Sequence, residues 1–263
     1  GPAMKLCPKL ILEGTRLTHK TDIAFALNEH PRVVGPRKYR YHSPVISAEW
    51  CAFTNVPWGR GLINFEPQEE ALAMETYATW ARLFELQRYY SWIIDRFHIS
   101  TIVHPRRARG REFDFRWLEE RLLPLGFRLI LCTRSPESFA QARAERLKVS
   151  GNPGQYDDLT PFIAEQDEMR FEVGRSLLPS YELDVSDDDV VGRGMAIEPL
   201  VGGDLVGAQN GTHLVVEDLG GGARQRGQAG GLQTTEINGQ VLTHPASAFD
   251  HLQRGEPVNM HAR

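Results

Sequence analysis

Apolar and polar positions along this chain form short blocks that predict strands and helices in alternation. The predicted strands are brief apolar runs, typical of strands buried within a sheet. They lie at 9–12, 32–35, 91–94, 127–132 and 181–185. The predicted helices are longer and mix apolar with charged positions. They lie at 22–28, 67–88, 98–104, 115–125, 135–149 and 159–177. Strands joined by helices indicate an α/β fold, in which ligands bind at the carboxyl ends of parallel strands.

The first predicted strand runs into the loop EGTRLTHKT, residues 13–21. A strand, a tight loop and a helix opening with Lys20-Thr21 are typical of a phosphate-binding P-loop. Such a loop aims backbone N–H groups and the positive end of a helix at a phosphate. Lys20 would reach the terminal phosphates, and the Thr21 hydroxyl would hold Mg²⁺. The competing interpretation is an ordinary strand–turn–helix, because His19 stands where the P-loop pattern has glycine.

Lysine is rare in this chain, with only five lysines among its 30 Lys and Arg residues. A chain that nearly always uses arginine has lysine at position 20, where phosphate binding needs a compact point charge. This choice favours the phosphate-binding interpretation.

Length and composition narrow the class of protein. The 263 residues allow one large domain, or one domain with an appendage. A net charge of −4 argues against generic nucleic-acid binding, and no apolar run reaches the roughly 20 residues of a membrane span. Cys7, Cys51 and Cys132 are widely separated and form no zinc pattern, so we expect reduced thiols in a cytoplasmic protein.

Segment 35–50, after the second predicted strand, interleaves cations with aromatic rings. Arg37 and Arg40 could grip an anion while Tyr39 stacks on a flat substrate. The alternative is a solvated loop whose tyrosines cover the core.

Two further groups of charged residues are candidates for the site. Asp95 closes the third apolar run beside Arg96, and an acidic residue there can hold Mg²⁺ through water or act as a base. Arg143 and Arg146 end a helix before a glycine-containing segment, as in a lid that closes on phosphates, although the helix dipole alone would also favour cations there. Residues 106–111 are predicted as a basic, solvent-facing turn.

After about residue 200 the chain becomes rich in glycine. Such a segment loses much entropy on ordering and offers few apolar anchors, which favours a flexible tail. The alternative is partial β structure, with strands at 212–216 and 236–242 and a hairpin turn at Asn238-Gly239.

Over roughly residues 5–200 the order of these parts resembles the thymidylate kinase-like branch of the P-loop nucleoside and nucleotide kinases. The loop EGTRLTHKT matches the pattern E-G-x-D-x-x-G-K-T at equal length, and DRFHIST, 95–101, matches a third strand ending in D-R-[FY]. The stretch FRLILCTRSPESFAQARAERL, 127–147, is similar to that family's fourth strand and lid. The resemblance implies a three-layer P-loop NTPase fold with a central, mostly parallel five-stranded sheet flanked by helices. That domain would span 5–200, and 201–263 would be a Gly-rich carboxyl-terminal extension.

The resemblance also implies roles for particular residues. ATP phosphates would be bound by the loop residues Gly14, Thr15, Arg16, Leu17, Thr18, His19, Lys20 and Thr21. Mg²⁺ would be held by Thr21 and Asp95. Catalysis would involve Lys20, Asp95, Arg96, Arg143 and Arg146. The acceptor would be bound by Arg37, Tyr39 and Arg40, and a homodimer would form through the 67–88 helix.

The sequence therefore predicts an ATP- and Mg²⁺-dependent phosphotransferase acting on a nucleoside, nucleotide or related small molecule. Arg16 replaces the acidic P-loop residue of thymidylate kinases, so the acceptor is not expected to be thymidine monophosphate. A non-nucleotide metabolite, such as an antibiotic precursor, is the alternative acceptor. The competing hypothesis is a catalytically retired kinase fold that serves as a nucleotide-binding or interaction protein, which His19 and Arg16 motivate.

Overall fold

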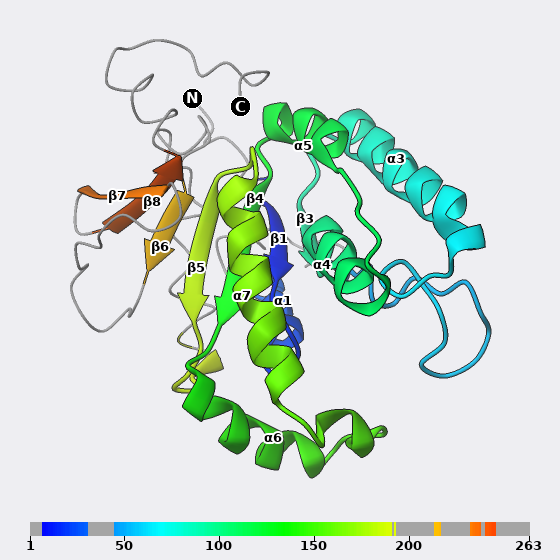
Figure 1. Ribbon diagram of the computed structural model, residues 1–263. Helices are drawn as coiled ribbons and strands as arrows, with labels where there is room; N and C mark the ends of the chain where they lie inside the picture. Colours follow the sequence, from blue (N-terminus) through cyan, green and yellow to red (C-terminus); the bar gives the residue numbers. More distant parts are fainter. Residues whose placement is uncertain are drawn as a thin grey trace.

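The computed structural model describes residues 7–30, 45–190 and 192, and the backbone of three short segments, 213–216, 232–237 and 240–245. Figure 1 shows a central sheet with helices on both of its faces. Arg37, Tyr39 and Arg40 of the predicted acceptor site, and the predicted strand at 32–35, lie outside the described residues.

Five parallel strands form the centre of the sheet. They are β1 (Lys9–Glu13), β2 (Val45–Ile46), β3 (Trp92–Asp95), β4 (Arg128–Thr133) and β5 (Ser180–Asp184). Their order is β2-β3-β1-β4-β5, and each neighbouring pair is parallel. β1 is the central strand of this order: β3 and β2 lie on one side of it, and β4 and β5 lie on the other. Open α/β sheets bind ligands at the carboxyl end of the strands where the strand order changes direction in this way.

Three more strands extend the sheet beyond β5. They are β6 (His213–Val216), β7 (Leu232–Ile237) and β8 (Gln240–Pro245). β6 is parallel to β5, whereas β8 is antiparallel to β6 and to β7. The predicted turn residues Asn238-Gly239 lie outside the described residues, between the end of β7 and the start of β8.

The helices close to their predicted ranges are α1 (Lys20–Asn28), α3 (Glu70–Leu86), α4 (His98–Arg109), α5 (Arg116–Leu122), α6 (Phe139–Leu147) and α7 (Thr160–Arg175). Short 3-10 turns lie at Pro67–Glu69, Leu123–Leu125, Pro136–Ser138 and Pro153–Tyr156. Proline suits the first turn of a helix because the N–H that it lacks would have no intrahelical partner there.

Alternation along the buried strands divides the core into two layers. Ile11 of β1 belongs to a core cluster that includes residues of α3, α4, α5 and α7, whereas Leu10 and Leu12 belong to a second cluster with Ile23 and Leu27 of α1. In Figure 1, α7 lies across one face of the sheet and α1 lies behind it. The described chain is therefore a three-layer α/β structure in which α1 starts at the carboxyl end of the central strand.

Two predictions of local structure were wrong. Val45–Ile46 form β2 in a segment for which no strand was predicted, because two residues are too few to show a strand period. Arg106 and Arg109 belong to the last turns of α4, which continues through Pro105 and ends at Gly110 in a left-handed conformation, so they are not part of a separate basic turn. No helix among the described residues has the length and apolar character needed to cross a membrane.

Candidate functional site

The loop between β1 and α1 is tightly curled. Gly14 has a φ of 154°, and a Cβ there would lie 2.7 Å from the Cys132 carbonyl oxygen and 2.7 Å from Thr18 Oγ1. Leu17 and His19 also have positive φ angles, 69° and 58°. Only glycine adopts such conformations at low cost, so the loop holds a shape that its other side chains resist.

Lys20 folds back over this loop. Its Nζ donates to the Thr15 carbonyl oxygen at 2.7 Å and lies 3.4 Å from Thr18 Oγ1, which itself donates to the Thr15 carbonyl at 2.7 Å. The side chain is buried, and burial lowers its pKa from the ordinary value; the charge of Arg96 lowers it further, against Asp95 and Glu49. The ammonium group is thus desolvated and lies beside the start of a helix.

Thr21 and Asp95 meet at the ends of neighbouring elements. Thr21 Oγ1 donates to Asp95 Oδ2 at 2.5 Å, while Asp95 Oδ1 is buried without a hydrogen-bond partner among the described residues. Burial raises the pKa of Asp95, which Lys20 and the Thr21 hydrogen bond partly offset. A buried carboxylate oxygen without a donor costs free energy that a cation or a water molecule would recover.

Glu13 fixes the start of α4 against β1. Its carboxylate accepts from the Phe97 N–H at 2.5 Å and from the Ser100 N–H at 2.7 Å. Arg96, at a φ of 62°, donates to Ser100 Oγ at 2.9 Å and to Glu165 at 3.1 Å. The predicted catalytic Arg96 is therefore brought to the site, but its guanidinium group has protein partners.

Glu49 is a further residue of the site that the sequence analysis did not identify. Its Oε1 lies 2.9 Å from Nη1 of Arg16. Burial works to raise the pKa of Glu49, but the charges of Arg96, Arg16 and Lys20 outweigh it and hold the pKa below the ordinary value. The carboxylate therefore stays charged among three cations.

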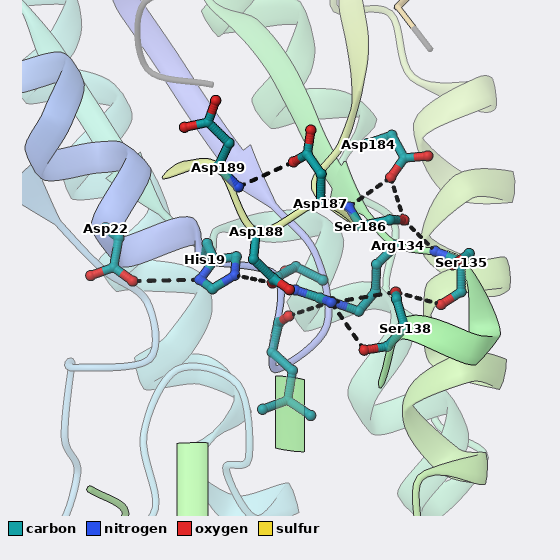
Figure 2. Close-up of polar contacts among 12 residues, drawn as sticks. His19, Asp22, Arg134, Ser135, Ser138, Asp184, Ser186, Asp187, Asp188 and Asp189 are labelled. Carbon is teal, nitrogen blue, oxygen red and sulfur yellow. Dashed lines mark hydrogen bonds and ion pairs between the residues drawn. The ribbon is translucent and has the colours of Figure 1, made fainter. Parts of the chain in front are cut away.

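Arg134 was also missed, and it contacts the loop directly. Its guanidinium donates to the Leu17 carbonyl oxygen at 2.7 Å and to Asp188 Oδ1 at 2.6 Å. The same carboxylate oxygen lies 2.6 Å from His19 Nε2, and Figure 2 shows the imidazole between Asp188 and Asp22. His19 Nδ1 lies 3.6 Å from Asp22 Oδ2, so carboxylates face both ring nitrogens.

The two predicted lid arginines are near each other but contact a different part of the chain. Arg143 donates to the Tyr156 carbonyl at 3.4 Å, and Arg146 donates to the Tyr156 hydroxyl at 3.3 Å. Both lie on α6, which Figure 1 shows beyond the carboxyl ends of β1 and β5. Of the predicted catalytic and metal-binding residues, the structure therefore brings together Lys20, Thr21, Asp95 and Arg96, and it leaves the two lid arginines apart from them.

Thr21 and Asp95 provide the small number of protein ligands that a magnesium ion takes in a phosphate site. A metal centre made entirely of protein side chains would need more ligands. No group of three or more His, Cys, Asp or Glu side chains suited to a metal occurs among the described residues. Mg²⁺ in phosphate sites takes one or two protein ligands, with phosphates and waters completing the octahedron. A threonine hydroxyl beside a carboxylate with one unpartnered oxygen meets that requirement.

Local sequence held only weak signals for the missed residues. Glu49 follows a two-residue strand that has no period, and Arg134 directly follows β4 in a chain rich in arginine. Asp188 lies in the acidic run Asp187-Asp188-Asp189, where no spacing singles out one carboxylate. A search for polar residues just past the carboxyl ends of strands would have found Arg134 but not its partners.

Comparison with known proteins leaves the family open. No protein-family model matches the chain, and no curated protein matches it.

Proposed function

We propose that this protein is an ATP-dependent phosphotransferase that transfers the γ-phosphoryl group to a nucleoside, a nucleotide or a related small molecule. The observation that supports it is the joint placement of Lys20 and Thr21 after a tightly curled loop, with Thr21 bonded to the strand-ending Asp95. The strand order β2-β3-β1-β4-β5 puts this loop where doubly wound folds bind phosphates. We therefore interpret the domain as a P-loop fold.

Phosphate binding would use the loop backbone, the start of α1 and Lys20. His19, which precedes the helix, makes no side-chain cap, so the first N–H groups of α1 remain available to an anion. Lys20 would exchange the Thr15 carbonyl for a phosphate oxygen, which would favour its charged form. Thr21 and Asp95 are the residues that would hold Mg²⁺, and the ion would supply charge neutralisation to the phosphates.

Acceptor activation is assigned to Glu49. In the proposed step, an acceptor hydroxyl attacks the γ-phosphorus, its proton passes to the Glu49 carboxylate, and ADP leaves with the electrons of the broken P–O bond. Glu49 forms an ion pair with Arg16, and the positive charge of Lys20 helps to lower its pKa. Arg96 would stabilise negative charge that develops beside Glu49. Arg143 and Arg146 on α6 would complete a lid.

Substitution of Lys20 tests the proposal. Lys20→Ala should lower turnover by at least about a hundredfold, since a positioned cation at developing charge contributes on that scale. In the unsubstituted protein, ATP with Mg²⁺ should raise Tm, with about 2.7 kcal/mol of added stability at a hundred times Kd. Lys20→Ala should remove that shift. Lys148→Ala, at an exposed lysine paired with Glu145, is the matched control and should change neither value.

The second candidate is a kinase fold that has lost catalysis and only binds nucleotide. It is favoured because His19 occupies the glycine position of the P-loop pattern and is hydrogen-bonded to Asp188. Full turnover in Lys20→Ala would contradict the catalytic proposal. A chain that gains Tm with ATP but consumes none with any nucleoside, nucleotide or small metabolite would support the retired, nucleotide-binding alternative. Screening acceptors with ATP consumption as the readout would also separate nucleosides from non-nucleotide metabolites.

A further inference from the structure

Three loops at the carboxyl end of the sheet meet at one carboxylate. Leu17 and His19 come from the loop after β1, Arg134 directly follows β4, and Asp188 lies in the turn after β5. Asp188 Oδ1 lies 2.6 Å from Arg134 Nη2 and 2.6 Å from His19 Nε2 (Figure 2). One oxygen atom therefore joins the loop between β1 and α1, the proposed phosphate loop, to the segments that follow β4 and β5.

Arg134 lies at this junction, and each of its three guanidinium nitrogens has a hydrogen-bond partner. Its side chain is fully buried, at 0 % exposure. Besides Asp188 it donates to the Leu17 carbonyl at 2.7 Å, to the Ser138 carbonyl at 3.2 Å and to Ser138 Oγ at 3.3 Å. A guanidinium group with partners for all three nitrogens is a support for the loop and not a ligand for substrate.

Hydrogen bonds join the turn after β5, which carries Asp188, to the turn after β4. The Ser135 N–H after β4 donates to Ser186 Oγ at 2.8 Å, and the Ser186 hydroxyl donates to Asp184 at the end of β5. The Val185 N–H donates to the Thr133 carbonyl at 2.7 Å. The turns after β4 and β5 are therefore held together independently of the phosphate loop.

His19 is, with Leu17, one of the two non-glycine residues of the loop that need such support. Its φ of 58° is left-handed, which glycine adopts freely and a side chain with Cβ resists. It also directly precedes α1, so its backbone sets the direction of the N–H groups of Lys20 and Thr21. If His19 relaxed to an ordinary conformation, those groups would turn away from a shared anion.

We propose that Asp188 is a positioning residue of the phosphate loop: through His19 and Arg134 it holds the left-handed turn that glycine provides in the usual P-loop pattern. This inference rests on the proposed function in that it makes affinity for the ATP triphosphate depend on a residue outside the loop. Asp188 is expected to act on the donor nucleotide and not on the acceptor.

The test uses the full chain with three substitutions and one control substitution. Asp188→Gly removes the carboxylate and tolerates the φ of 60° at this position, whereas Asp188→Asn keeps an oxygen acceptor and also suits that conformation. His19→Gly supplies the missing glycine. Asp189→Ala, at the exposed next carboxylate, is the matched control.

The first readout is hydrogen exchange of the ligand-free protein. Asp188→Gly should speed exchange of the amides at 17–23 by about tenfold, since loss of a charged hydrogen-bond partner destabilises on that scale. Asp188→Asn should have a smaller effect and Asp189→Ala none. If Asp188→Gly does not fold, Asp188→Asn and His19→Gly carry the comparison. Unchanged exchange at 17–23 would overturn the inference.

The second readout is the kinetics with ATP. Asp188→Gly should raise KM for ATP about tenfold while leaving KM for the acceptor unchanged. In the His19→Gly background the same change should have less than half of that effect on a logarithmic scale, because glycine no longer needs the support. Equal effects in both backgrounds would overturn the role assigned to His19.

Failure of the two proposals gives different results. If exchange at 17–23 responds to Asp188 but ATP gives no Tm shift in the unsubstituted protein, the loop support stands and the phosphotransferase proposal fails. If the unsubstituted protein consumes ATP with an acceptor, and ATP stabilises it and Asp188→Gly equally well with unchanged exchange, the phosphotransferase proposal stands and the role of Asp188 is wrong.

Discussion

Lys20 and Asp95 interact at the end of the central strands, and burial shifts the pKa of each toward its neutral form. The protein without ligand therefore holds both groups in a less favourable state than water would. A bound anion would favour the charged form of Lys20, and a bound cation would favour the charged form of Asp95. Burial thus disfavours the same charged forms that the proposed ligands would favour.

Gly14 gives a prediction about the loop backbone. Gly14→Ala should destabilise the fold by about 3 kcal/mol, because its φ of 154° is strained for alanine and the new Cβ would lie 2.7 Å from the Cys132 carbonyl. Gly110→Ala is the matched control, since Gly110 also has a positive φ but has nothing within 4 Å of a Cβ; it should cost about 1 kcal/mol. Urea unfolding measures both, and equal losses would contradict the close approach.

Cys132 gives a prediction about pH. Burial beneath the loop raises the pKa of its thiol from 9.0 to about 12, so the folded protein keeps the proton while the unfolded chain releases it. Stability should therefore fall as pH rises from 9 toward 12, and this fall should be smaller in Cys132→Ala. Urea unfolding at pH 8 and pH 10 measures it. At pH 8, iodoacetamide should label the partly exposed Cys7 well before Cys132.

At the scale of elements, a buried carboxylate joins the helices on one face of the sheet. Glu119 of α5 accepts from His98 of α4 at 3.0 Å and from the Leu177 N–H after α7 at 3.3 Å, and the Ser176 hydroxyl also donates to it. α4, α5 and the residues directly after α7 thus meet at one carboxylate. Their relative positions depend on that residue more than on any surface ion pair.

Glu119→Ala should therefore destabilise the protein by about 3 kcal/mol, because it leaves buried donors unpaired. Glu120→Ala, at the next residue, is the control; its carboxylate forms a half-exposed pair with Arg116, and its loss should cost about 0.5 kcal/mol. Thermal unfolding followed by circular dichroism compares the two. Similar Tm values for both variants would show that the network adds little.

At the scale of the whole molecule, the outer side of α3 is the surface through which we expect two copies of the chain to pair. Leu72, Leu83 and Leu86 are exposed by 48 %, 39 % and 61 %, although they lie on a helix whose other side is buried in the core. Their spacing brings them onto one stripe. A second copy of this chain is the occupant that the sequence analysis expected, and a stripe along one helix can pair with itself about a two-fold axis.

Sedimentation tests this arrangement. The unsubstituted chain should sediment as a dimer of the 29.7 kDa chain, and Leu72→Glu with Leu83→Glu should convert it to a monomer. Because both leucines are exposed in the single chain, the melting transition of the monomer should remain cooperative. Leu147→Glu, at an exposed leucine on α6, should leave the dimer intact. A monomeric unsubstituted chain would contradict the prediction.

Much of the described α/β core was predictable because its signals are local. The apolar runs at 91–94 and 127–132 correspond to β3 and β4, and the helix predicted at 159–177 corresponds to α7 at Thr160–Arg175. β2 escaped prediction, since Val45–Ile46 become a strand only by pairing with Ile93 and Ile94. The predicted acceptor residues Arg37, Tyr39 and Arg40 lie outside the described residues, so that part of the site stays a prediction.

The sequence alone determined the alternation of strands and helices and the position of Lys20 and Thr21 at the start of α1, because period and adjacency are properties of neighbouring residues. Only the tertiary structure decided which distant charges face that loop. Glu49, Arg134 and Asp188 are 29, 114 and 168 residues away from Lys20 in the chain, and parallel pairing of β2 to β5 around β1 brings the ends of their strands to one edge. Contacts set by strand order leave no local pattern, so no reading of nearby residues could have shown that Asp188 would contact His19.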